Sequence, residues 1–126
     1  MTSFTDDINR TNYYGCALDL EPDDKRHAEF QKQRRERGFD DSETWCLRTA
    51  ILQFTLPRLK RFKEVDCGYP MQSTPEAWSA ELEEMIFAIE TLLEDKYWES
   101  PDKEAIQARV DAGLKLFHDR FYDLWW

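Results

Sequence analysis

The chain has 126 residues, of which 41% are hydrophobic and 34% are charged, and its formal net charge at pH 7 is −9. This composition is typical of a globular protein and excludes a disordered one, and the length fits one domain. No apolar run approaches the roughly 18 residues of a membrane helix, and the first residues lack the apolar segment of a secretory signal, so we expect no membrane contact and a cytoplasmic location.

The negative charge is concentrated in the second half of the sequence. Residues 1–64 contain 12 Lys and Arg and 12 Asp and Glu, whereas residues 65–126 contain 5 and 14, a net charge of −9. Such a surface repels phosphate. We therefore expect binding to a basic partner rather than to nucleic acid.

The first part of the chain divides into an irregular arm and a basic helix. Residues 1–22 show no hydrophobic period, so we expect an irregular N-terminal arm before a single helical domain over residues 23–126. The segment 25–37 contains six cations and only Ala28 and Phe30 as apolar residues. We expect it to be weakly anchored, or to dock on an acidic surface.

A helix with a kink is predicted after Gly38. Asp40 and Glu43 have the spacing of a capping box, in which each side chain accepts a hydrogen bond from the other residue's backbone N–H. Pro57 lies within the apolar stripe and has no N–H to donate, which predicts a kink or a restart of the helix there. The stripe consists of Leu52, Leu56 and Leu59.

Two further helices are predicted, each with a proline at its start. Thr74 and Ser100 both precede a proline, the order expected for an N-cap and the first helical residue. The short connection 95–99 makes the two helices antiparallel neighbours, and Gly113 allows a close crossing between them. The apolar stripe of the second helix consists of Ile106, Val110, Gly113, Leu114, Phe117, Phe121, Leu124 and Trp125. The predicted fold is all-α, a small bundle of three to four helices.

The three cysteines do not form a metal-binding pattern. Cys16, Cys46 and Cys67 are widely spaced and contain no Cys-x-x-Cys pair. We therefore expect three reduced thiols and no zinc site.

Two carboxylate pairs resemble the metal ligands of the all-helical nucleotide pyrophosphohydrolases. Glu81 and Glu84 form one pair, and Glu99 and Asp102 form the other. Such enzymes use converging carboxylates to hold Mg²⁺ against phosphate oxygens. Because Pro101 divides the second pair, we favour a solvated helix face, and we predict no catalytic residue, no metal site and no cofactor.

Two clusters are candidates for binding. The first contains four cations and an aromatic residue, namely Arg58, Lys60, Arg61, Lys63 and Tyr69. The cations either pair with the acidic half of the protein or hold an anion such as a phosphate, with Tyr69 stacked on a base. The second cluster is the aromatic C-terminus, where Tyr122, Trp125 and Trp126 are expected to contact a partner protein and to form the centre of a homodimer.

Several short motifs resemble those of a family of short, uncharacterised proteins of tailed bacteriophages. The motifs are GFDDSETW at 38–45, PRLKRFKE at 57–64, GYP at 68–70, PEAW at 75–78 and the aromatic end FYDLWW at 121–126. The resemblance covers about residues 38–90 and the C-terminus, and Ala77 departs from it where the family more often has an acid. It implies a phage origin and an all-helical fold, and it implies no activity.

The expected function follows from this resemblance, from the acidic net charge and from the high aromatic content of 14%. We expect a non-enzymatic phage accessory protein that binds a host or phage protein, for example an inhibitor of host defence in the host cell cytoplasm. An alternative is a small-molecule binder that sequesters a nucleotide signal through the cations and aromatic residues. A Mg²⁺-dependent nucleotide pyrophosphohydrolase is the least favoured.

Overall fold

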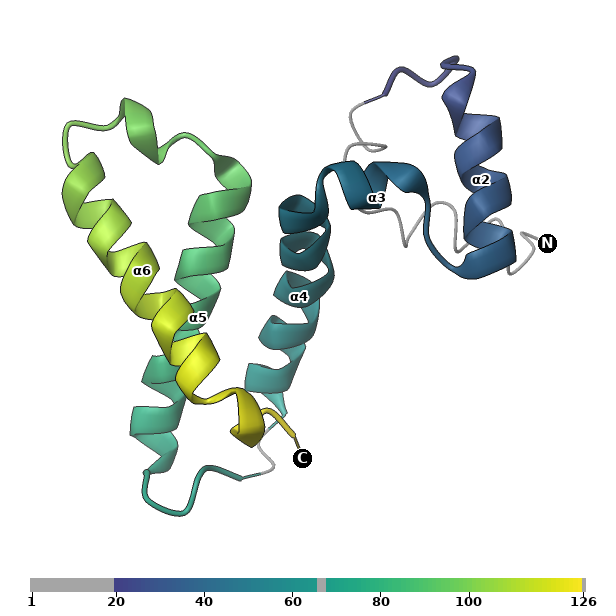
Figure 1. The fold of residues 1–126 in the computed structure, drawn as a ribbon. Helices are drawn as coiled ribbons and strands as arrows, with labels where there is room; N and C mark the ends of the chain where they lie inside the picture. The colour runs from purple at the N-terminus through teal and green to yellow at the C-terminus, as the bar shows by residue number, and fades with distance from the viewer. Residues whose placement is uncertain (1–19, 66–67, 126) are drawn as a thin grey trace. The chain divides into compact units, whose positions relative to one another are not determined.

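The computed structural model describes residues 20–65 and 68–125, and within these residues all regular secondary structure is helical (Figure 1). The elements are α2 (Arg26–Arg37), α3 (Asp41–Trp45), α4 (Leu47–Glu64), α5 (Pro75–Glu94), the 3-10 helix η2 (Tyr97–Glu99), α6 (Lys103–Asp119) and the 3-10 helix η3 (Phe121–Asp123). The predicted all-α class is confirmed. None of the described helices has the length and apolar character needed to cross a membrane.

The chain forms two compact units, Met1–Phe54 and Thr55–Trp126, which we call unit 1 and unit 2. The division falls within α4. The single helical domain expected over residues 23–126 stays a prediction. Of the expected N-terminal arm, residues 1–19 lie outside the described part of the chain.

In unit 1, α2 begins beside an aspartate and ends at a glycine. The Asp24 carboxylate accepts hydrogen bonds from the backbone N–H of Arg26 at 2.9 Å and from its guanidinium at 2.8 and 3.0 Å. A negative charge is favourable at this end of the helix dipole. Gly38 has a φ of 86°, which residues with a Cβ rarely adopt, and its N–H donates to the carbonyl of Arg34.

The basic helix α2 is firmly anchored, contrary to the expectation from its composition. Phe30 is 3% exposed, and its ring meets that of Trp45 edge-on with the centroids 5.7 Å apart. The Arg34 side chain is buried, and its Nη1 donates to the buried carboxylate of Asp40. Weak anchoring, the first of the two alternatives, is therefore wrong, because Phe30 and Arg34 belong to the core of unit 1. The second alternative named an acidic surface, and two cations of the helix, Arg34 and Arg37, do pair with the nearby carboxylates of Asp40 and Asp41.

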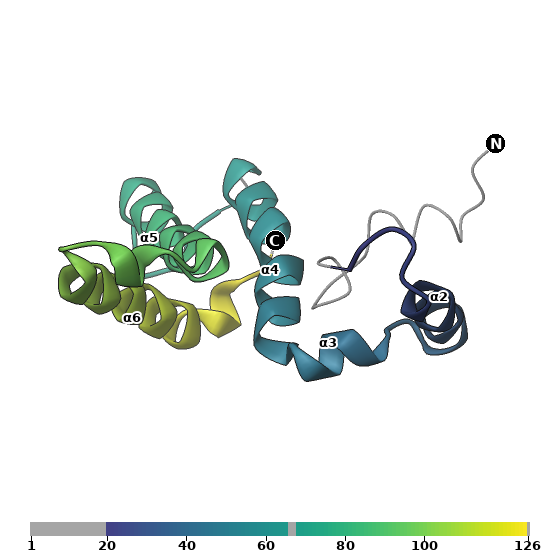
Figure 2. The same cartoon turned by 90° about the horizontal axis from the view of Figure 1, so that it is seen from above.

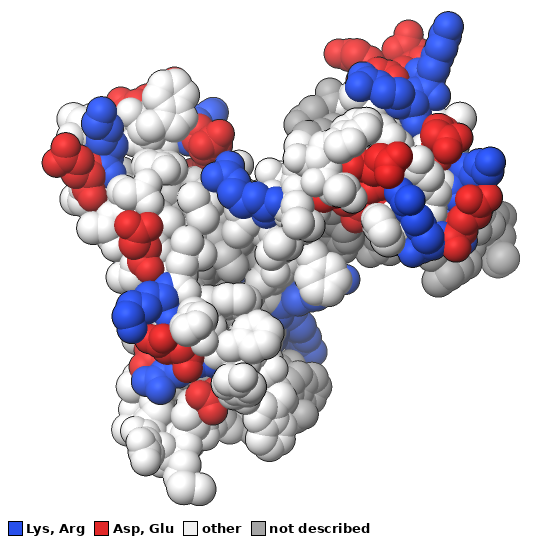
Figure 3. Space-filling model, in the orientation of Figure 1, with Lys and Arg blue, Asp and Glu red and all other residues white. Residues whose placement is uncertain are grey.

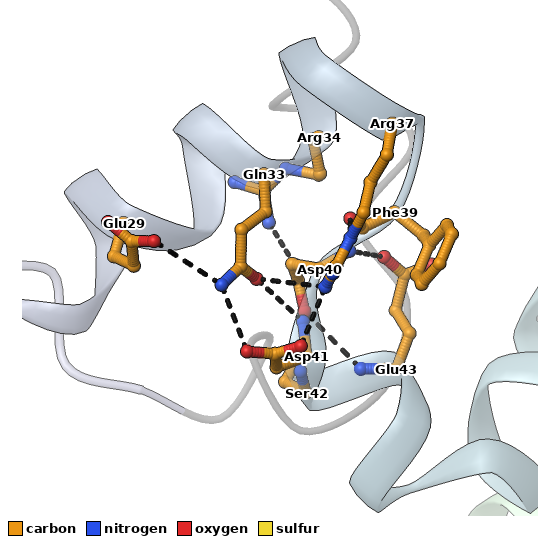
Figure 4. Close-up of polar contacts among 9 residues, drawn as sticks. All are labelled: Glu29, Gln33, Arg34, Arg37, Phe39, Asp40, Asp41, Ser42 and Glu43. Atoms are coloured by element: carbon orange, nitrogen blue, oxygen red, sulfur yellow. Dashed lines mark hydrogen bonds and ion pairs between the residues drawn. The ribbon is translucent and has the colours of Figure 1, made fainter.

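The predicted capping box starts α3 (Figure 4). Asp40 Oδ1 accepts from the backbone N–H groups of Ser42 at 2.8 Å and Glu43 at 3.3 Å, and Glu43 Oε2 accepts from the N–H of Asp40 at 2.7 Å. Gln33 joins α2 to this box, because its amide donates to the Asp41 carboxylate at 2.9 Å and accepts from the Asp41 N–H at 2.8 Å.

The helix break lies before α4 rather than at its proline. The backbone leaves the helical conformation at Cys46, where φ is −112° and ψ is 48°, and α4 then continues through Pro57 to Glu64. The helix therefore does not restart near Pro57, contrary to that expectation. A proline removes one hydrogen bond of the ladder, and the other bonds of an 18-residue helix keep it continuous.

Cys46 is disulfide-bonded, which corrects the expectation of three reduced thiols. Cys16 and Cys67 lie outside the described residues. The spacing of cysteines along a chain can argue against a metal site, but it does not show which cysteines the fold brings together.

Unit 2 is built on the antiparallel pair α5 and α6, which lie side by side in both views (Figures 1 and 2). The hydroxyl of Thr74 caps α5 by accepting from the N–H of Ala77 at 3.1 Å, as predicted. At the start of α6, Ser100 accepts from the N–H of Asp102 at 3.1 Å, and the helix begins only at Lys103. The core between the helices contains Met85, Ala88 and Val110, all with 0% exposure.

The two helices cross closely at Gly113, as the sequence predicted. A Cβ added to this glycine would lie 2.4 Å from the carbonyl oxygen of Glu84 and 2.7 Å from the Cβ of Ala88. Both distances are shorter than van der Waals contact, so only a residue without a side chain fits here.

The apolar stripe predicted for α6 and the following residues is buried only in part. Val110 and Gly113 are buried, whereas Leu114, Phe121 and Trp125 are 39, 59 and 76% exposed. Apolar spacing predicts the face that a helix could bury, but a partner element must cover that face. The residues after Gly113 therefore leave a large apolar surface on unit 2.

Candidate functional site

An open groove lies in unit 2 beside the C-terminal segment. It has a volume of about 720 Å³ and is formed by the end of α4, the loop 68–71, the start of α5 and the residues after η3. In Figure 1 the yellow segment after α6 reaches toward the ends of α4 and α5 that form the groove. A volume of ~300–1,000 Å³ is typical of ligand pockets, so several side chains of a partner fit.

The floor of the groove is apolar and ordered. It contains Phe62 of α4 and Trp78 and Leu82 of α5. Trp78 and Leu82 are 5 and 3% exposed, and the rings of Phe62 and Trp78 meet edge-on with centroids 6.4 Å apart. Because these residues also belong to the core of unit 2, the floor is formed before any ligand arrives.

The walls of the groove are large side chains that remain exposed. Tyr69, Met71 and Trp125 are 52, 97 and 76% exposed. Beside them, Phe121 and Tyr122 are 59 and 90% exposed, with centroids 6.4 Å apart. Figure 3 shows that uncharged residues cover much of the face of unit 2 that includes α6, between small groups of charged side chains.

The groove combines residues from both clusters predicted from the sequence. Lys63 and Tyr69 come from the proposed anion site, and Trp125 comes from the aromatic C-terminus. Tyr122 is exposed but does not line the groove, and Trp126 lies outside the described residues.

The cations of α4 are mostly engaged with carboxylates. Lys60 lies 3.5 Å from Glu90 and Lys63 lies 3.1 Å from Glu83, so both pair with α5. Arg61 pairs with Glu64 at 3.2 Å within its own helix, and Arg58 is an exposed residue of the same helix. Two of these four cations, Lys60 and Lys63, therefore pair with the acidic half of the protein, which is one of the two alternatives left open by the sequence.

Two of the four carboxylates that resembled a metal site, Glu81 and Glu84, are paired with arginines. Glu84 accepts two hydrogen bonds from Arg109 at 2.9 and 3.0 Å, and the guanidinium lowers the pKa of this carboxyl. Glu81 accepts two from Arg120 at 2.8 and 3.2 Å. Within the described residues, no group of three His, Cys, Asp or Glu side chains is placed to hold a metal ion.

Three groove residues were missed by the sequence reasoning as binding residues. Trp78, Leu82 and Met71 belong to neither of the two clusters that the sequence indicated as binding sites. Their role depends on the approach of the C-terminal segment, which lies more than forty positions away in the chain. The available signal was the high aromatic content, 14% of the residues, which exceeds what a small core needs.

Comparison of the chain with protein-family models, with curated proteins and with solved structures found no match.

Proposed function

We propose that this protein acts by binding another protein, without catalysis, and that the groove of unit 2 is its contact surface. The observation that carries the proposal is the exposure of Tyr69, Met71 and Trp125 around an ordered apolar floor. Contiguous exposed aromatic surface on a small protein marks an interaction site, and tryptophan and tyrosine contribute strongly to binding energy in such sites.

The resemblance of several motifs to those of phage proteins supports a biological setting for this binding. A phage accessory protein that blocks a host protein, for example one used in host defence, needs a contact surface and no catalytic centre. The motifs at 38–45, 57–64 and 68–78 support this part of the proposal, and the last two include residues of the groove.

The two alternative functions receive less support from the geometry. A nucleotide would have to displace Glu83 from Lys63 before its phosphate could bind there. A pyrophosphohydrolase would have to release Glu81 and Glu84 from Arg120 and Arg109 before they could hold Mg²⁺. Breaking these ion pairs costs free energy, and binding of an apolar side chain in the groove does not require it.

Affinity capture with two matched tryptophan variants tests the proposal. The wild type, Trp125→Ala and Trp98→Ala are used to capture proteins from a bacterial lysate, and the captured protein is purified and titrated. Trp98 is a suitable control because it is 58% exposed and lies in η2, which follows the other end of α5. We expect Trp125→Ala to weaken binding by at least about 30-fold, or about 2 kcal/mol, and Trp98→Ala by less than about threefold.

Equal effects of the two variants would show that the groove is not the contact surface. A thermal-shift screen with nucleotides, with and without Mg²⁺, covers the alternatives. Stabilisation by a nucleotide without turnover would replace the proposal with small-molecule binding, and turnover would replace it with hydrolysis.

A further inference from the structure

One carboxylate and one cation line the groove, and a second carboxylate lies beside it. Asp123 lines the groove, and Glu76 lies beside Pro75, which belongs both to the groove and to an adjoining shallow pocket. Arg120 lies close enough to Asp123 for this carboxylate to contribute to the raised pKa of its guanidinium, but Arg120 forms its hydrogen bonds with Glu81. The one cation of the lining, Lys63, is paired with Glu83 at 3.1 Å.

The wider surface of unit 2 has the same sign. Residues 55–126 contain nine Lys and Arg and fifteen Asp and Glu, a net charge of −6. Negative charge on this scale attracts cationic segments and repels anionic ones before contact is made. An apolar segment with acidic flanks would therefore meet repulsion at the mouth of the groove.

The aromatic walls also favour a cation. Trp125 and Tyr69 are more than half exposed, so both residues have surface that a partner can contact. A Lys or Arg beside an aromatic face is attracted by the ring electrons, and tryptophan is the strongest such acceptor. Unit 2 already contains this arrangement elsewhere, with the Arg109 guanidinium 3.6 Å from the centroid of Phe87.

We infer that the groove receives a bulky apolar side chain from a partner segment that carries Lys or Arg beside it. This inference rests on the proposed function and specifies the chemistry of the partner. The apolar side chain is buried on Trp78 and Leu82, and the flanking cations lie near Asp123 and Glu76. Binding therefore combines burial of apolar surface with ion pairs at the rim.

Two matched synthetic peptides test the charge preference. Both carry the same Leu and Trp residues on one face of a short helix, and they differ only in having Lys or Glu beside that face. Fluorescence anisotropy of the labelled peptides measures their affinity for the full chain. At about 50 mM salt we expect the Lys peptide to bind at least about tenfold more tightly than the Glu peptide, and at about 0.5 M salt we expect this preference to shrink.

Charge variants of the protein assign the preference to the groove. Glu76→Gln with Asp123→Asn should reduce the preference for the Lys peptide to less than about threefold. Glu94→Gln with Glu104→Gln removes the same charge from exposed positions that do not line the groove, and should leave the preference unchanged. Trp125→Ala should weaken the binding of the Lys peptide itself. Circular dichroism checks that each variant is folded.

The other possible results contradict either the cationic partner or the use of the groove. Equal affinity for both peptides, lost on Trp125→Ala, overturns the cationic partner and leaves the groove as a protein-binding site. Binding of the Lys peptide that survives Trp125→Ala shows general charge attraction and overturns the inference. Absence of binding by either peptide overturns it too, and affinity capture then decides the proposed function separately. A dimer of the free chain that Trp125→Ala dissociates shows that a second copy occupies the groove and also overturns the inference.

Discussion

Asp40 accepts hydrogen bonds from three neighbours at the centre of unit 1. Its carboxylate accepts from the backbone N–H and the hydroxyl of Ser42 at 2.8 and 2.5 Å, from the N–H of Glu43, and from the guanidinium of Arg34. The side chains of Asp40 and Arg34 are 0 and 1% exposed. A charge buried this deeply is tolerated only with its partner in place, so this carboxylate both starts α3 and keeps Arg34 inside unit 1.

Replacing Asp40 should destabilise the protein strongly. We expect Asp40→Ala to lower the free energy of unfolding by about 3–5 kcal/mol, because Arg34 is then a buried charge without its carboxylate. Chemical denaturation measures the change. Asp41→Ala is the matched control. Asp41 pairs with Arg37 at 2.6 Å where both side chains are more than 40% exposed, and it also accepts from Gln33, so its loss should cost much less than the loss of the buried Asp40. Similar losses for the two variants would contradict the assignment of Asp40 to the core.

The Glu84–Arg109 pair should make stability depend on pH in the acidic range. The guanidinium lowers the pKa of Glu84 in the folded protein. A carboxyl whose folded pKa lies below its unfolded pKa stabilises the protein above the unfolded value, about 4.3, and this contribution is lost as the pH falls through the folded value. Glu84→Gln should therefore be less stable than the wild type at pH 7 and similar to it near pH 3.

Denaturation midpoints at several pH values check this expectation. In an Arg109→Gln background the carboxyl no longer has its partner, so the further change Glu84→Gln should make little difference at any pH. A gap between Glu84→Gln and the wild type that is constant from pH 7 to pH 3 would show that the pair does not shift the titration.

At the scale of elements, the contact between α5 and α6 organises unit 2. The helices can approach because Gly113 has no side chain where the backbone of Glu84 passes. The same approach places Arg109 within reach of Glu84, so the glycine and the ion pair belong to one crossing.

Substitution of Gly113 should separate the two helices. Alanine in a helix is normally more stable than glycine by about 1 kcal/mol, yet we expect Gly113→Ala to destabilise the protein by about 1–3 kcal/mol because its Cβ would overlap the Glu84 carbonyl. Ala112→Gly, at an exposed neighbouring position, should show only the loss of about 1 kcal/mol that helix propensity predicts. Thermal denaturation compares the two, and a more stable Gly113→Ala would mean that the crossing is wider.

At the scale of the molecule, the division into two units predicts that a destabilising substitution in one unit leaves the stability of the other unit nearly unchanged. The buried pair Arg34–Asp40 belongs to unit 1, whereas Leu82, with 3% exposure, belongs to the core of unit 2. Regions that bury their residues separately open separately in hydrogen exchange.

Hydrogen exchange with mass spectrometry tests the independence of the units. Asp40→Ala should lower the amide protection of α2 and α3 and leave that of α5 and α6 near the wild-type level. Leu82→Ala, which creates a core cavity that costs about 2–5 kcal/mol, should have the reverse effect. A uniform loss of protection in both variants would show that the chain unfolds as one unit.

The homodimer expected from the sequence stays a prediction, which light scattering at about 100 μM tests.

The local features of this protein follow from the sequence, and the physical reason is their range. The capping box at Asp40 and Glu43 and the cap at Thr74 each involve residues a few positions apart, where geometry within one helix decides the contact. The close crossing at Gly113 could be predicted too, because glycine inside an apolar stripe has few other uses.

Only the tertiary structure decided which of these features are buried and which meet. Arg34 has the same local pattern as the solvated cations of α2, and its burial depends on the chain turning at Gly38 to bring Asp40 back to it. The exposed end of the α6 stripe and the groove of Phe62, Tyr69 and Trp125 depend on contacts between segments far apart in the chain. The free energy of such contacts comes from the burial of surfaces that meet only after folding. Periodicity and spacing along the chain therefore do not predict these contacts.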